Sequence, residues 1–81
     1  MNSNKQNLIN KIIYRSQYRG TKEMDIFLGN FVKSIINSLS LEELKDLDIL
    51  INMNDEEIMK IFDGIKQFKN VKILKFLRNS R

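Results

Sequence analysis

Residues 39–59 read LSLEELKDLDILINMNDEEIM, and this stretch contains two helix starts in succession. Ser40 is followed three residues later by Glu43, and Asn54 is followed in the same way by Glu57. This is the spacing of a capping box, in which each side chain accepts a hydrogen bond from the backbone N–H of the other residue. The repeated pattern fixes the points at which two helices begin.

Apolar residues reinforce both helix starts. The residue before the cap and the residue four positions into the helix can pack together as a hydrophobic staple. Such pairs are Leu39 with Leu44 and Met53 with Ile58. The pattern predicts helices over residues 41–52 and 55–63, and Gly64 is placed to end the second one in a left-handed conformation.

Apolar residues recur at helical spacings of three and four on both sides of this stretch. They predict a first helix that ends near residues 16–19, with Gly20 at positive φ, then a helix over 21–39 and a last helix over 69–79. The residues expected to face the core are Leu8, Ile9, Ile12, Ile13, Met24, Phe27, Leu28, Phe31, Ile35, Leu39, Leu44, Leu47, Leu50, Ile51, Ile58, Ile61, Phe62, Phe68, Val71, Leu74 and Leu77. The sequence predicts an all-α fold, a compact bundle of five short helices in a single domain over residues 1–81.

The composition of the 81 residues excludes several classes of protein. There is no Cys and no His, so disulfides, thiol nucleophiles and histidine-ligated zinc are excluded. The three glycines are isolated and form no phosphate loop, and the acids of the middle segment lack a calcium-loop pattern. No apolar run approaches the roughly 20 residues of a membrane-spanning helix. We therefore expect neither an enzyme nor a metal site nor a transmembrane segment.

The charge of the chain, +4 overall, is divided into blocks. Residues 1–22 carry five Lys or Arg and no acid, residues 23–64 carry all ten acids, and residues 65–81 carry six Lys or Arg and no acid. The simplest interpretation is attraction between the blocks within the molecule.

Two alternatives place a partner on the basic segment. A small basic helical protein could bind nucleic acid through the cations of this segment or through a helix-turn-helix of the third and fourth helices. These cations are Lys66, Lys69, Lys72, Lys75, Arg78 and Arg81. One observation argues against nucleic-acid binding. The helix over 55–63 begins with acidic residues, and the N-terminal end of a recognition helix is the end that usually contacts the bases. The cationic, apolar stretch FKNVKILKFLRNSR at 68–81 could instead lie on a membrane surface.

Charged and aromatic residues also gather at the junction of the first two predicted helices. They are Arg15, Tyr18, Arg19, Gly20, Glu23 and Asp25. Arginine offers a planar set of donors suited to carboxylates and carbonyls, and glycine lets another backbone approach closely. Tyr14 and Tyr18 add the kind of contact area that is enriched at interfaces. An ordinary basic helix, glycine cap and acidic first turn would explain the same residues.

The segment YRSQYRGTKEMDIFLGNF at 14–31 resembles the signature of the succinate dehydrogenase assembly factor 2 family, the flavinylation factors. The hallmark of that family is R-G-x-x-E, usually extended to R-G-x-x-E-x-D. The matching residues are Arg19, Gly20, Glu23 and Asp25. Residues 39–64 are similar to the second half of the family. The chain departs from the family pattern at Tyr18, Asn54 and Ile61, where Arg, Pro and Trp are common.

The resemblance implies a chaperone-like assembly factor. Such a factor binds the flavoprotein subunit of succinate dehydrogenase and promotes covalent attachment of FAD to a histidine of that subunit. The cofactor then belongs to the client, and the factor needs none of its own. The resemblance leaves open whether the related fumarate reductase subunit is also a client. It implies that the six junction residues bind the partner, with Asp25 either contacting it or orienting Arg19. We expect a monomer in the bacterial cytoplasm that binds no nucleic acid.

Overall fold

The computed structural model describes residues 3–79, and within them the chain forms five α-helices, one short 3-10 helix and no strand. The helices are α1 (Ser3–Gln17), α2 (Lys22–Ile35), η1 (Ile36–Ser38), α3 (Leu41–Ile51), α4 (Asp55–Phe62) and α5 (Val71–Arg78). The all-α fold of five helices that the sequence predicts is confirmed. Both capping boxes are formed as predicted, at Ser40 and at Asn54.

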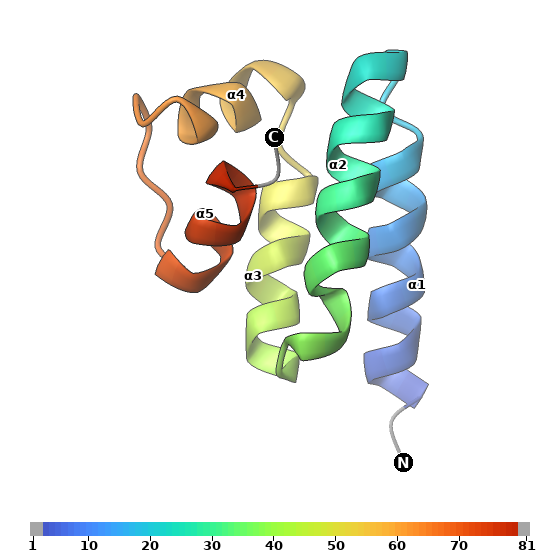
Figure 1. The fold of residues 1–81 in the computed structure, drawn as a ribbon. Coiled ribbons are helices and arrows are strands. Elements are labelled where there is room, and N and C mark those ends of the chain that lie inside the picture. Colours follow the sequence, from blue (N-terminus) through green and yellow to red (C-terminus); the bar gives the residue numbers. More distant parts are fainter. Residues whose placement is uncertain (1–2, 80–81) are drawn as a thin grey trace.

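The first three helices lie side by side and alternate in direction, as Figure 1 shows. α1 packs against both α2 and α3. The chain then turns away from these three helices, so that α4 and α5 lie on the far side of α3 from α1 (Figure 1). As a consequence, the α1–α2 turn and the α3–α4 turn come to the same end of the bundle (Figure 1).

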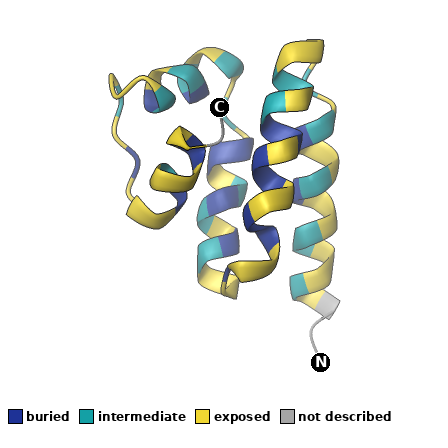
Figure 2. Ribbon diagram, viewed as in Figure 1, coloured by how far each residue is buried: buried dark blue, intermediate teal, exposed yellow. Residues whose placement is uncertain are grey.

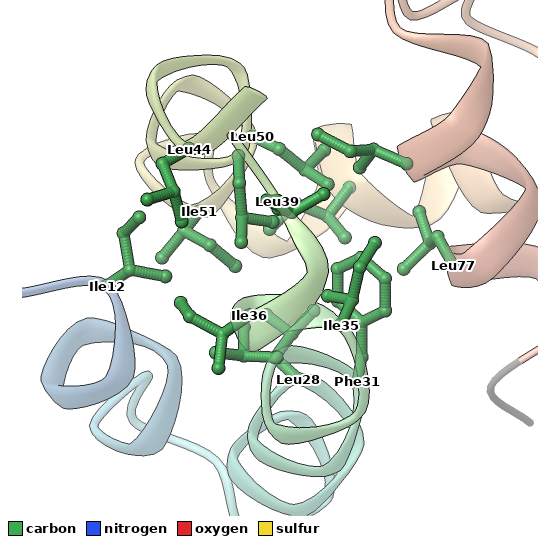
Figure 3. Packing of buried hydrophobic residues seen from close by; sticks show 14 of the residues in the cluster. Ile12, Leu28, Phe31, Ile35, Ile36, Leu39, Leu44, Leu50, Ile51 and Leu77 are labelled. Atoms are coloured by element: carbon green, nitrogen blue, oxygen red, sulfur yellow. The ribbon is translucent and has the colours of Figure 1, made fainter. Parts of the chain in front are cut away.

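The core is a single apolar cluster between these helices. The residues labelled in Figure 3 come from α1, α2, η1, α3 and α5, and from Leu39 between η1 and α3. Figure 2 shows that the buried positions form stripes along the inner sides of the helices, as amphipathic helices require. The buried apolar residues are Ile12, Leu28, Phe31, Val32, Ile35, Ile36, Leu39, Leu44, Leu47, Leu50, Ile51, Ile58, Ile61, Phe68, Ile73 and Leu77.

Two helix boundaries differ from the prediction by more than one residue. The second helix ends at Ile35 rather than at Leu39 and continues as the 3-10 turn η1. There the hydroxyl of Ser38 donates to the carbonyl of Ile35 at 2.8 Å, which competes with the helical backbone bonds. The last helix begins at Val71 rather than at 69, because the side chain of Asn70 caps it by accepting from the N–H of Ile73 at 3.1 Å.

The late start of α5 changes which of its residues are buried. The sequence pattern predicts Val71 in the core, but Val71 is 58% exposed. Phe68 is buried from the loop before the helix, so it does not set the phase of the helical stripe. Within α5 the buried residues are Ile73 and Leu77, which lie one turn apart.

The basic segment after α4 pairs with acids of α3 and α4. Its lysine ammonium groups lie 2.9–3.4 Å from carboxylate oxygens of three acids. These pairs are Lys66 with Glu57, Lys69 with Asp46 and Lys72 with Glu43. Attraction between the charge blocks, the simplest interpretation of the sequence, is therefore confirmed. Arg81, the last charge of this segment, lies outside the described residues.

Glu43 and Glu57 each serve two elements. Their carboxylates accept from the backbone N–H of Ser40 and Asn54 in the capping boxes, at 2.9 and 3.5 Å, and also pair with the lysines above. These contacts hold the pKa of both carboxyls below the usual range; the largest cause is the Ser40 N–H for Glu43 and the Lys66 hydrogen bond for Glu57. The pKa of Asp46 is lowered first by the hydrogen bond from Asn70 and then by Lys69.

These lowered pKa values predict that acid destabilises the fold. The ordinary values are 4.5 for Glu and 3.8 for Asp, so below them the unfolded chain binds more protons than the folded one. The stabilisation is complete above pH 4.5 and is lost as the pH falls through the lowered values. Thermal unfolding followed by circular dichroism should give a melting temperature that falls steadily below pH 4.5.

A double lysine variant tests this explanation. K66M/K69M removes the lysine partners of Glu57 and Asp46. Its melting temperature should therefore be closest to that of the wild type at low pH and should be lower than the wild-type value above pH 4.5. The control K33M/K45M has the same change in net charge and removes no contact to the three acids. Equal pH dependence of the two variants would contradict the assignment.

Candidate functional site

Arg19 joins the two turns at one end of the bundle. Its side chain is only 11% exposed. The guanidinium donates to the backbone carbonyls of Ile51 and Met53. It also donates to Oδ1 of Asp55, from Nε at 3.0 Å and from Nη2 at 2.9 Å. One side chain of the α1–α2 turn therefore binds the α3–α4 turn through three different residues.

The charges of the two turns explain why an arginine is suited to this place. Ile51 is the last residue of α3, where the carbonyls lack partners within the helix and the helix dipole is negative. Asp55 is the first residue of α4 and lies at the positive end of that helix. The planar guanidinium can donate to the carbonyls and the carboxylate at once, and hydrogen bonds between charged groups are the stronger ones.

The backbone of the α1–α2 turn is fixed by Asp25 and Gly20. Oδ1 of Asp25 accepts from the backbone N–H of Arg19 at 2.5 Å. Gly20 has φ +108°, a conformation that a residue with a Cβ adopts only under strain. A Cβ built on Gly20 would have open space around it, so the need for glycine within the chain is conformational. The turn thus presents a bare backbone to the outside.

Tyrosine and arginine side chains surround a shallow hollow on the α1 side of these turns, with a volume of about 210 Å³. The rings of Tyr14 and Tyr18 pack together at an interplanar angle of 35°, with their centroids 4.6 Å apart, and the two residues are 64% and 68% exposed. Arg15 donates to the side-chain oxygen of Asn52 across the hollow. Exposed aromatic groups beside an arginine are typical of protein contact surfaces.

A larger hollow of about 500 Å³ lies between α2 and α4, and we call it the α2–α4 groove. Its apolar lining consists of Met24, Ile26, Phe27, Met59 and Phe62. The rings of Phe27 and Phe62 meet edge to face, with centroids 5.5 Å apart. Glu23 also lines the groove, so this residue of the α1–α2 junction is part of its wall.

The six residues predicted at the junction lie in two different environments. Arg19 and Asp25 are half-buried and their polar groups bind within the chain. The other four are exposed at the surface, namely Arg15, Tyr18, Gly20 and Glu23. Of the two roles left open for Asp25, the structure contains a contact that orients the backbone of Arg19. Binding of a partner by these residues stays a prediction.

Sequence reasoning did not find the α3–α4 turn as a part of the site. Asp55 belongs to a helix start, which accounts for an acid there without any tertiary contact. The carbonyls of Ile51 and Met53 are backbone groups, whose partners leave no trace in residue type. Asp55 lies 36 residues from Arg19, too far for any local pattern to connect the two.

The chemistry available at this end of the bundle is that of recognition. Its side chains offer the exposed carboxylate of Glu23, an arginine, two tyrosines and an apolar groove. Among residues 3–79, no three acidic side chains come close enough together to hold a metal ion. None of the helices in the described part of the chain is long and apolar enough to cross a membrane.

Comparison with known proteins shows which family the chain resembles. Residues 10–81 match the family described as "Flavinator of succinate dehydrogenase". The chain is 37% identical over 57 residues to succinate dehydrogenase assembly factor 2, mitochondrial, of Arabidopsis thaliana, a match that covers 70% of this chain and 30% of the relative. It is 35% identical over 48 residues to the FAD assembly factor SdhE of Acetobacter pasteurianus, covering 59% of this chain and 44% of the relative.

A third relative is matched over more of the chain. The mitochondrial succinate dehydrogenase assembly factor 2 of Lodderomyces elongisporus is 32% identical over 75 residues, which cover 84% of this chain and 46% of the relative. The chain thus spans less than half the length of each of these three relatives. No solved structure matches the chain.

Proposed function

The chain belongs to the flavinator of succinate dehydrogenase family, and from this premise we propose that it binds the flavoprotein subunit of succinate dehydrogenase and promotes covalent attachment of FAD to it. The observation that carries the proposal is the match over residues 10–81, which includes the whole R-G-x-x-E pattern at 19–23. The structure supports it with an exposed edge around Gly20 and Glu23, held in place from inside.

The proposed role of the chain is to bind one conformation of its client. FAD and the residue that it becomes attached to both belong to the client, so this chain supplies no cofactor and no nucleophile. Binding that aligns the acceptor side chain with the flavin accelerates the reaction through proximity and orientation. It also shifts the conformational equilibrium of the client towards the state that is bound.

The structure suggests a division of work within the site. Gly20 and Glu23 form the edge that the client meets, because they are exposed and lie on a turn of fixed shape. Arg15 and Tyr18 extend this surface along α1. Arg19 contributes from inside, since its guanidinium holds the two turns together. In this proposal Arg19 is a positioning residue and the four exposed residues touch the client.

A change at Glu23 tests the contact edge. Glu23→Gln keeps the size of the side chain and removes its charge, so it should lower covalent flavin on the co-expressed flavoprotein, measured by in-gel fluorescence, by roughly tenfold. Glu42→Gln is the matched control, because Glu42 is an exposed glutamate on α3 that lines neither hollow. Equal flavin loading with both variants and the wild type would remove Glu23 from the contact edge.

Client range, compartment and oligomeric state extend the proposal. We propose that the fumarate reductase flavoprotein is a second client, which co-expression with that subunit tests by the same fluorescence. The bacterial cytoplasm is supported by the match to the Acetobacter factor, although other relatives are mitochondrial proteins. We propose a monomer, because the apolar cluster is already closed by the five helices of one chain.

Ion pairs within the chain take up part of the charge on which the nucleic-acid alternative depends. Lys66, Lys69 and Lys72 are paired with acids of α3 and α4, which reduces the positive potential that phosphate would meet. The fourth helix begins with three acids, at Asp55, Glu56 and Glu57. No observation in the structure favours this alternative over the flavoprotein client.

A further inference from the structure

We propose that the α2–α4 groove binds an apolar side chain of the flavoprotein subunit, and that this apolar residue lies beside an arginine or lysine of the same subunit. The inference rests on the proposed function and adds a second contact region to it. It assigns binding to Ile26, which lies outside the R-G-x-x-E pattern, and gives the recognised segment of the client a stated chemistry.

The apolar part of the proposal follows from exposure. Ile26 is 53% exposed although it lies beside the half-buried Met24 and Phe27. Contact between water and the apolar residues of the groove is unfavourable. An apolar side chain that replaces this water lowers the free energy roughly in proportion to the apolar area that it covers. Methionines such as Met24 and Met59 have flexible, polarizable side chains, which adapt well to the shape of a partner.

The charged part follows from Glu23. Glu23 lines the groove and is exposed, and its carboxylate has no ion pair or hydrogen bond within the described residues 3–79. Within residues 3–79, seven of the ten side-chain carboxylates form ion pairs and Asp25 accepts a backbone N–H. Glu23 and Asp63 do neither, and of these two only Glu23 lines the apolar groove. A cation on the partner would complement it and would also fix the direction in which the apolar side chain enters.

The groove is continuous with the proposed contact edge, because Glu23 belongs to both. A client that meets Gly20 and Glu23 therefore reaches the mouth of the groove without crossing any other surface. This continuity favours the flavoprotein as the occupant over a second copy of the chain.

Two isoleucine variants of equal chemistry test the proposal. Ile26→Ser removes the exposed apolar group at the groove, and Ile49→Ser removes one of similar exposure, 47% against 53%, from α3 away from both hollows. The dissociation constant for the purified succinate dehydrogenase flavoprotein of the same organism should rise about tenfold for Ile26→Ser and by less than about twofold for Ile49→Ser. Thermal melts should show the same folded state for both variants.

The charged contact has its own readout. Raising the salt concentration should weaken wild-type binding more than binding by Glu23→Gln, because the variant has lost the charge that salt screens. Hydrogen exchange on the flavoprotein should then reveal a protected segment that contains an apolar residue beside Arg or Lys. That protection should persist with Ile49→Ser and weaken with Ile26→Ser.

Three results would overturn the proposal, and they differ in what they mean. Absence of wild-type binding would defeat the proposed function together with this inference. Wild-type binding that Glu23→Gln weakens and Ile26→Ser leaves unchanged would defeat the groove alone. A wild-type dimer in sedimentation that Ile26→Ser dissociates would assign the groove to a second copy of the chain.

Discussion

Arg19→Ala is expected to lower the free energy of unfolding by about 2–3 kcal/mol, because it leaves the carbonyls of Ile51 and Met53 and the carboxylate of Asp55 without their shared donor. For a domain of this size, that loss corresponds to a fall in melting temperature of roughly 10–20 °C. Client binding should weaken by more than the loss of folded protein explains, since the two turns are no longer held in a fixed relation.

Three further variants separate the explanation from a general loss of charge. Arg15→Ala removes an exposed arginine whose side chain donates a hydrogen bond to Asn52, and it should change stability by less than about 0.5 kcal/mol. Arg19→Lys keeps the charge and should still lose most of the stability, because an ammonium cannot reproduce the planar set of donors. The loss of stability in Asp55→Asn should lie between the losses in Arg15→Ala and Arg19→Lys. Full stability of Arg19→Ala by chemical denaturation would show that the contacts across the turns do not hold the fold.

Gly20→Ala is expected to cost about 1–2 kcal/mol of stability and to reduce client flavinylation severely. The stability cost comes from φ +108° alone, because a Cβ there meets no atom within 4 Å. In the proposed complex the effect on the client has a different source: the added methyl group would occupy the open space in which the client backbone approaches Gly20. Chemical denaturation and in-gel flavin fluorescence measure the two effects separately.

Gly64→Ala is the matched control for Gly20→Ala. Gly64 also has positive φ, +81°, and it ends α4 rather than joining α1 to α2. Its Cβ would lie 3.4 Å from a guanidinium nitrogen of Arg78, the far end of a flexible side chain. The two variants should therefore lose similar stability, while flavin loading falls only with Gly20→Ala. Equal flavin loading in both would mean that the α1–α2 turn has no special part in client binding.

The local features of the fold could be predicted because their causes lie within a few residues of one another. The capping boxes at Ser40 and Asn54 and the positive φ of Gly20 and Gly64 all form as the sequence predicts. The position of Val71 could not be predicted correctly. Asn70 caps α5, so the helix begins only at Val71, and Phe68 packs into the core from the preceding loop. A helical stripe drawn through Phe68 and Val71 therefore places Val71 on the wrong face of the helix.

By itself, the sequence determined the five helices, the points at which most of them begin and end, and the R-G-x-x-E pattern that marks the family. Only the tertiary structure decided where the residues of that pattern lie and which groups they contact. Arg19 binds groups 32 to 36 positions away, and its side chain lies inside the site while Glu23 remains exposed. The physical reason is the range of the interactions. Caps and turns depend on residues that are neighbours in the chain. The contacts of a guanidinium between two turns, and a groove between two helices, form only after packing has brought distant segments together.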